Sequence, residues 1–230
     1  MQLVAVIAKS GQQARSLNTQ TALMEAAEKL AAQNGLAGIS IKDIVRQARQ
    51  KNESALQYHF KNLRGLIHAI NEKRSLQIHE KRAELLEALM SRDESPDVAD
   101  LCRLMIMPSF LLGQDDPKFR QYIAGFGHEI ALAPNSAFDL VKRAGGGGES
   151  GQKMGELLRS ALPHLDDEAF VSRMDQASRL CALSMANQAK QPSAFQGKSA
   201  DLFVCNLIDA LIGLLSAPES EQTKKLRRKR

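Results

Sequence analysis

The sequence lacks the features that mark secreted, membrane-spanning and zinc-binding proteins. Its 230 residues include three cysteines, and Cys102, Cys181 and Cys205 are widely spaced among apolar neighbours. This odd, dispersed set gives no indication of a disulfide framework or a paired-cysteine zinc site, and it predicts small buried side chains. No stretch approaches eighteen consecutive apolar residues, and the apolar run 3–8 is too short for a signal-peptide core. We therefore expect a cytoplasmic protein without a membrane span.

The sequence also lacks a recognisable catalytic or cofactor motif. No Ser/His/Asp, Cys/His or paired-carboxylate set has an interpretable spacing. His59, His68 and His79 do not have the i, i+4 spacing that places two metal ligands on one helical face. The glycine-rich segment 145–151 has no lysine followed by serine or threonine, so it is expected to be a flexible surface loop and not a phosphate-binding loop. We expect no catalytic residue, no metal and no cofactor.

The apolar residues recur at helical spacing, and no useful length of chain alternates with the period of a strand. The pattern predicts an all-α fold of about nine or ten helices. A long helix over 62–92 would reach roughly 45 Å, enough to connect two domains. The charge is uneven as well: up to Ser75 there are eleven basic against five acidic residues, and after Ala217 six against two. Because the net charge is +5, the middle of the chain is acidic, as expected when a polyanion-binding module is joined to a different kind of domain.

The stretch 40–60 has the pattern of a helix-turn-helix. Ser40 is suited to cap a helix, with Asp43 three residues later, and Ile41, Ile44 and Val45 fall on its inner face. Four polar residues then precede a short second helix whose outer face is polar. Its amides, hydroxyl and polar-tipped rings suit phosphates and base edges in a major groove. On spacing alone, a solvated surface helix of any helical protein is an equal alternative.

Residues 21–74 resemble the N-terminal domain of the TetR family of one-component transcriptional regulators. The similar pieces occur in the family's order, at 21–30, 34–35, 39–44 and 55–62. Two positions depart from the family pattern, which usually has glycine where Arg49 stands and a basic residue where Leu63 stands. The displaced Arg64 is the candidate to replace that basic residue as a phosphate contact.

The resemblance implies a sequence-specific, homodimeric DNA-binding regulator that binds a palindromic operator, and a repressor released by a small ligand. The alternative is a helical enzyme or carrier that keeps the helix-turn-helix as structure alone. The expected organisation is a flexible arm over 1–17, a three-helix DNA-binding domain over 18–65, a helical effector-binding and dimerisation domain over 66–216, and a basic disordered tail over 217–230. The arm is either a frayed terminus or a means for Arg15 to reach the minor groove. The candidate DNA-binding residues are Ser40, Lys42, Lys51, Asn52, Ser54, Gln57, Tyr58, His59, Lys61 and Arg64.

Two further surfaces are predicted in the larger domain. Methionine and aromatic residues concentrate between 101 and 140, which fits either an ordinary core or an adaptable pocket for an uncharged, apolar effector. The candidate pocket residues are Met105, Phe110, Tyr122 and Phe126. The helix expected over 199–216 is apolar on more than one face, so a second chain is expected to cover it together with the helix over 167–190. The candidate dimer residues are Met174, Cys181, Phe203, Leu207, Leu211 and Leu214.

Overall fold

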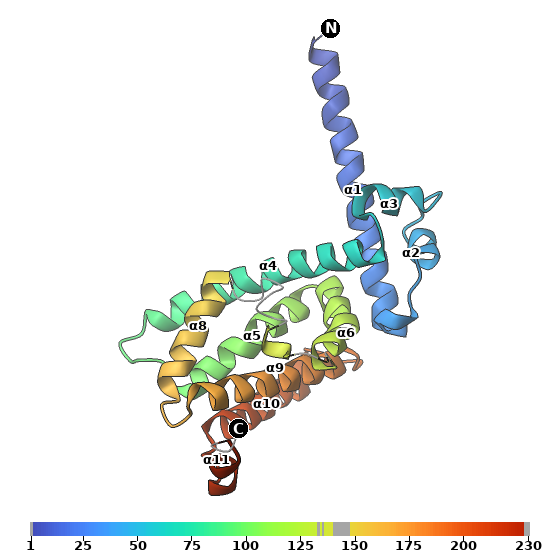
Figure 1. Cartoon of the computed structure of the whole chain (residues 1–230). Coiled ribbons are helices and arrows are strands. Elements are labelled where there is room, and N and C mark those ends of the chain that lie inside the picture. The colour runs from blue at the N-terminus through green and yellow to red at the C-terminus, as the bar shows by residue number, and fades with distance from the viewer. Residues whose placement is uncertain (1, 133, 135, 140–147, 228–230) are drawn as a thin grey trace.

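The computed structural model describes residues 2–132, 134, 136–139 and 148–227. Within these residues the regular structure is helical and contains no strand, which confirms the predicted all-α class. A small N-terminal group of helices, the head, is joined to a larger helical group, the body (Figure 1). The head consists of α1 (Gln2–Asn34), η1 (Leu36–Gly38), α2 (Ile41–Gln47) and α3 (Ser54–Phe60).

The first helix departs from the expected arm over 1–17. α1 begins at Gln2 and continues through Asn18, which was expected to cap a shorter helix. Its N-terminal half projects away from the rest of the molecule (Figure 1). The physical reason is that the segment contains no proline, and Gly11, its one glycine, weakens a helix by about 1 kcal/mol without ending it. The C-terminal half of α1 packs through Leu23 and Ala27 into the head core.

The long helix α4 (Leu63–Met90) connects head and body, as predicted. Asn62 caps it, because its side chain accepts a hydrogen bond from the N–H of Gly65 at 2.9 Å. The apolar residues of α4 enter two different cores. Leu66 and Ile70 lie in the head core, and Leu86 and Leu89 lie in the body core.

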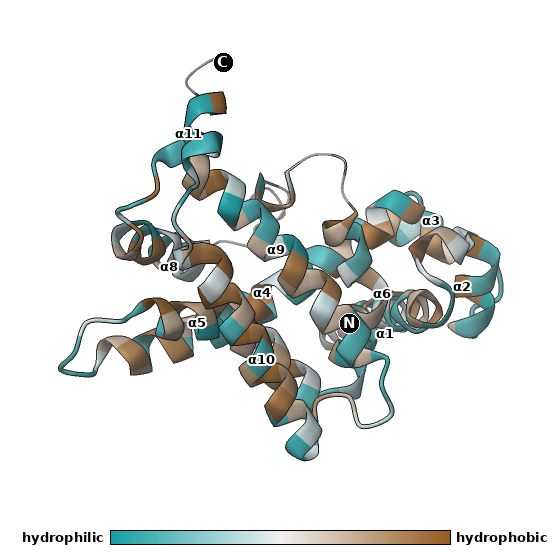
Figure 2. Ribbon diagram, turned by 90° about the horizontal axis from the view of Figure 1, so that it is seen from below, coloured by the Kyte–Doolittle hydropathy of each residue, from teal (hydrophilic) through white to brown (hydrophobic). Residues whose placement is uncertain are grey.

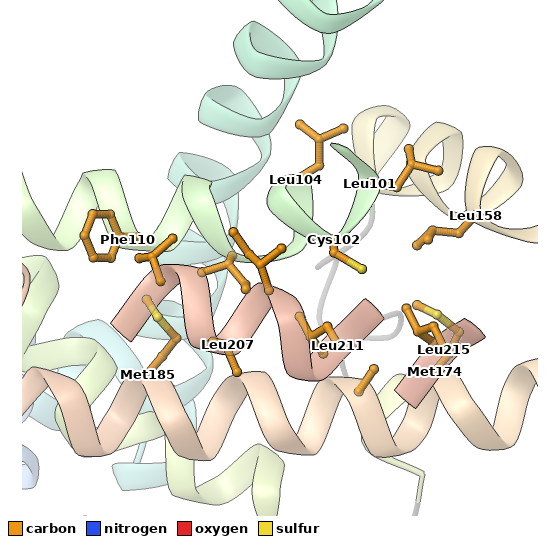
Figure 3. Packing of buried hydrophobic residues seen from close by; sticks show 14 of the residues in the cluster. Leu101, Cys102, Leu104, Phe110, Leu158, Met174, Met185, Leu207, Leu211 and Leu215 are labelled. Atoms are coloured by element: carbon orange, nitrogen blue, oxygen red, sulfur yellow. The ribbon is translucent and has the colours of Figure 1, made fainter. Parts of the chain in front are cut away.

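The body is formed by the remaining helices, which are α5 (Val98–Asp115), α6 (Pro117–Ala131), α8 (Gly148–Ala161), α9 (Asp167–Ala189), α10 (Gly197–Ser216) and α11 (Glu221–Arg227). Leucine, methionine and phenylalanine side chains of α5, α9 and α10 fill the space between these helices (Figure 3). α5 begins with a capping box in which Asp97 and Asp100 each accept a hydrogen bond from the other's N–H. Asp116 caps α6 with Pro117 in its first turn, as the sequence predicts.

Two segments expected to be irregular contain helix. In the tail over 217–230, residues 221–227 form α11, and Arg227 pairs with Asp166 and Glu219, so the chain is held against the body there. In the glycine-rich segment 145–151, the first turn of α8 begins at Gly148, while 145–147 lie outside the described residues. The hydroxyl of Ser150 is buried and donates to the backbone oxygen of His79 on α4 at 3.1 Å, which fixes this end of α8.

Candidate nucleic-acid interface

Local hydrogen bonds fix the start of α2. The Ser40 Oγ accepts from the N–H of Asp43 at 3.2 Å and donates to the Asp43 carboxylate at 2.6 Å, which confirms Ser40 as the N-cap. Asp43 also forms an ion pair with Arg46 at 2.5 Å. The hydrogen bond from Ser40, and then the charge of Arg46, hold the pKa of the Asp43 carboxyl below its usual value. The Ser40 hydroxyl is therefore already engaged within the head.

The turn between α2 and α3 contains a left-handed residue that is not glycine. Arg49 has a φ of 54°, and its N–H donates to the Arg46 oxygen at 3.1 Å while the N–H of Gln50 donates to the Val45 oxygen at 2.9 Å. An L-residue with a Cβ in this region is strained by about 1–2 kcal/mol. The turn thus has the geometry of a helix-turn-helix, and a strained arginine occupies the position where the family usually has glycine.

The short helix α3 separates an apolar face from a polar one. Leu56 and Phe60 are buried in the head core, which fixes the orientation of α3 against α1 and α4. On the opposite side Tyr58 is 82% exposed, and Ser54 and Gln57 are exposed beside it. A large ring held almost entirely in water on an otherwise polar helix is available to contact a partner.

The structure places nine of the ten predicted DNA-binding residues on the exposed surface of α2, α3 and the segments beside them. The nine are Ser40, Lys42, Lys51, Asn52, Ser54, Gln57, Tyr58, Lys61 and Arg64. His59 differs, because it is half-buried and its Nδ1 lies 3.2 Å from the side-chain amide of Gln20 on α1. The Asn52 side chain accepts from the N–H of Ser54 at 3.1 Å, so it also stabilises the start of α3. Exposed Arg46 and Arg49 were not among the predicted residues, although the basic excess of this segment points to them.

The aromatic residues among the four predicted pocket residues make two separate ring contacts. Phe110 packs edge-on against Phe195 with ring centroids 5.2 Å apart. The rings of Tyr122 and Phe126 are tilted against each other with centroids 5.1 Å apart, and Phe126 belongs to the head core. The structure has a cavity of about 290 Å³ between α4 and α8 and another of about 430 Å³ between α9 and α11. None of the four residues, Met105 included, lines either of them.

The predicted dimer residues divide into two groups. Met174, Leu207 and Leu211 are only 2%, 5% and 0% exposed, because they fill the core between α9, α10 and the rest of the body (Figure 3). The chain's own helices therefore cover these three side chains. Cys181, Phe203 and Leu214 are half-buried and pack against the body core, whereas Leu202 of α10 is 61% exposed.

The outer faces of α9 and α10 form one side of the body (Figure 2). We call this side the α9–α10 face; the large exposed apolar residues of the two helices are Val171 and Leu183 on α9 and Leu202 on α10. α10 is long and apolar enough to cross a membrane by length and composition. Its buried positions, however, pack into the body core, and Asp201 and Asp209 are exposed on its outer side. This combination is typical of a core helix with one partly apolar outer face.

The described residues offer little for catalysis. No group of three His, Cys, Asp or Glu side chains among them could hold a metal ion. Burial raises the pKa of the Cys102 and Cys181 thiols to about 12, so neither is a reactive thiolate near neutral pH. The exposed polar surface of the head is the candidate functional site that the contacts described above support.

Comparisons with known proteins identify the fold. No protein-family model matches the chain, and no curated protein matches it. A Rhodococcus sp. structure assigned to the TetR family of transcriptional regulators is 16% identical, with a TM-score of 0.53 over 84% of this chain and 98% of that one. GusR of Salmonella enterica is 18% identical with a TM-score of 0.45, covering 86% of this chain and 96% of its own. A transcriptional regulator from Rhodococcus sp. Rha1 is 15% identical with a TM-score of 0.45, covering 87% and 99%. The first of these likenesses, read with the head and body described above, shows that the chain has the fold of a TetR-family regulator.

Proposed function

We propose that this protein is a sequence-specific DNA-binding transcriptional regulator that acts in the cytoplasm as a homodimer. The observation that carries the proposal is α3, a helix held rigidly by Leu56 and Phe60 that presents an exposed polar face with basic residues on both sides. Phosphate contacts orient such a helix on the duplex, and contacts to base edges supply the sequence preference. The competing assignment, a helical enzyme or carrier, lacks a comparable constellation in the described residues.

The decisive experiment is capture of genomic DNA fragments by the purified protein, followed by sequencing. A regulator should enrich fragments that share one imperfect palindrome and should retard that palindrome in a gel. An enzyme or carrier would recover fragments without a common sequence. This outcome would sink the proposal, because sequence-specific binding is its central claim.

Two substitutions separate base reading from phosphate binding. Gln57→Ala should relax the sequence preference, because the Gln57 amide is exposed on the outer face of α3. Lys51→Ala should weaken binding to every sequence and reduce the slope of log affinity against log salt by about one. Filter binding at several salt concentrations, on the operator and on a scrambled duplex, measures both effects. A Lys51→Ala variant with altered preference and an unchanged salt slope would contradict this division of roles.

We infer that the dimer forms through the α9–α10 face. Large apolar side chains of these two helices are exposed, and Cys181, Phe203 and Leu214 are only half-buried. A two-fold axis at this face would present two copies of α3 to the same side of a duplex. The two recognition helices would then contact half-sites about one helical turn, roughly 34 Å, apart, which is why the operator should be a palindrome.

The regulator is further proposed to be a repressor that an uncharged, apolar small molecule releases from DNA. Support comes from the contact between the rings of Tyr122 and Phe126, which lie where the two cores meet. A molecule inserted there would displace the head from the body. Because coupling is reciprocal, DNA must weaken effector binding by the same factor. A thermal-shift screen of apolar compounds, repeated with operator DNA present, tests this. A compound that binds equally well to free and DNA-bound protein is not the effector.

A further inference from the structure

α6 lies between α1 of the head and α9 of the α9–α10 face, and it approaches both helices through glycine (Figure 1). A Cβ on Gly125 would lie 2.8 Å from the backbone C of Ala31 and 2.8 Å from the backbone N of Ala32 on α1. A Cβ on Gly127 would lie 2.8 Å from the backbone oxygen of Ala182 on α9. The opposing atoms are backbone atoms and the Cβ atoms of Ala31 and Ala186, so no flexible side chain could move aside.

Polar contacts also hold the two ends of α6 against α1 and α9. Near its N-terminus Lys118 forms an ion pair with Glu25 of α1 at 2.6 Å. At its C-terminus the guanidinium of Arg179 on α9 donates to the backbone oxygen of Ala131 at 2.9 Å. α6 is therefore fixed to the head at one end and to α9 at the other, and the two glycine contacts lie between these anchors.

We propose that Gly125 and Gly127 are positioning residues that set the separation of the two recognition helices in the dimer. This inference rests on the proposed function, and in particular on a dimer through the α9–α10 face. In such a dimer α9 lies near the two-fold axis, whereas α1 carries α2 and α3. The separation of α1 and α9 across α6 therefore contributes to the distance from the axis to each α3. The half-site spacing that the protein prefers follows from that distance.

The experiment compares Gly125→Ala and Gly127→Ala with the parent and with Gly155→Ala. Gly155 is the matched control, because it lies within α8 and a Cβ there would meet nothing within 4 Å. Affinities are measured for an isolated half-site and for palindromes whose half-site spacing changes one base pair at a time. The two test variants should retain the parent's half-site affinity. They should lose roughly a hundredfold on the parent's preferred palindrome, because simultaneous engagement of both half-sites is lost. The control should match the parent on every duplex.

A second pair of variants covers the case in which the added methyl groups prevent folding. Ala31→Gly and Ala186→Gly remove the methyl groups that face Gly125 and Gly127, and exposed Ala88→Gly on α4 is their control for the loss of helix propensity. The looser packing of α6 against α1 and α9 should reduce the difference in affinity between the best spacing and its neighbours, and the half-site affinity should stay unchanged. Parent-like spacing preference in all folded test variants would overturn the inference. A parent that binds no duplex, or that binds with no preferred half-site spacing, overturns the proposed function, and this inference falls with it. A parent with one preferred spacing, shared by all folded test variants, overturns the inference alone.

Discussion

At the scale of single residues, the left-handed backbone of Arg49 predicts that a glycine at this position stabilises the protein. Arg49→Gly should raise the free energy of unfolding by roughly 1 kcal/mol, because glycine adopts a φ of 54° without the Cβ clash, partly offset by its greater freedom in the unfolded chain. Urea denaturation measures the change. Arg49→Lys keeps both the Cβ and the charge, and it should leave the stability near that of the parent. A destabilised Arg49→Gly protein would show that the arginine side chain contributes contacts that outweigh the strain.

The buried ion pair between Arg74 and Glu28 supports a second prediction. The pair is 3% and 2% exposed, has N–O distances of 2.6 and 2.8 Å, and joins α4 to α1. Burial lowers the pKa of Arg74, but its hydrogen bonds to Glu28 and the charge of Asp116 outweigh this and raise it, so the guanidinium stays charged. Arg74→Met should destabilise the protein by about 3–5 kcal/mol, because it leaves a buried carboxylate unpaired.

The double variant Glu28→Leu/Arg74→Met is the control for this prediction. Replacing both charges by apolar groups removes the unpaired carboxylate, so it should cost far less than Arg74→Met alone. Thermal and urea unfolding of the parent, Glu28→Leu, Arg74→Met and the double variant complete this double-mutant cycle. Additive losses in the two single variants and the double variant would mean that the two charges do not stabilise each other.

Individual residues differ in how far the sequence could predict them. Ser40 and Asn62 were predicted as caps because capping depends on residue type and on neighbours within one turn. The unusual turn at Arg49 was signalled by the glycine that the family usually has there. The burial of Arg74 was not predictable, because its partner Glu28 lies on a different helix and nothing local marks the pairing.

At the scale of helices, α10 provides a paired test of interface against core. Leu202→Glu places a charge at an exposed position of α10 and should yield a folded monomer, whereas Leu211→Glu buries a charge where the parent side chain is 0% exposed. The second change should unfold the protein, since a buried unpaired charge costs several kcal/mol. Sedimentation and circular dichroism distinguish the two outcomes. A dimeric Leu202→Glu variant would place the interface elsewhere.

Helices were easier to predict than the contacts between them. The caps at Asn62 and Asp116 and the apolar periodicity located α4 and α6 within a few residues. The contacts of Phe126, by contrast, were not predicted, because the crossing of α6 over α1 places it in the head core. The helical start of α1 was missed because the segment has no amphipathic period, and the absence of helix breakers was the only available signal.

At the scale of the whole molecule, head and body should unfold together. The two cores share helices: α4 contributes Leu66 and Ile70 to one and Leu86 to the other, and Tyr122 of α6 packs against both. Neither core can lose its structure without exposing apolar surface of the other. Calorimetry should therefore show one transition whose calorimetric and van't Hoff enthalpies agree, with both dimer and unfolded monomer included in the fit. Two resolved transitions would show that the head unfolds independently.

For the same reason, the helix-turn-helix head cannot be transferred to another protein as an independent domain. Its core is completed by Leu66 and Ile70 of α4 and by Phe126 of α6, which lies far along the chain. A fragment cut after residue 65 would lack all three side chains and would expose the surface they cover. A chimaera that transfers this head to another body must carry the first half of α4 and the C-terminal half of α6 with it, or supply equivalent apolar side chains from the recipient.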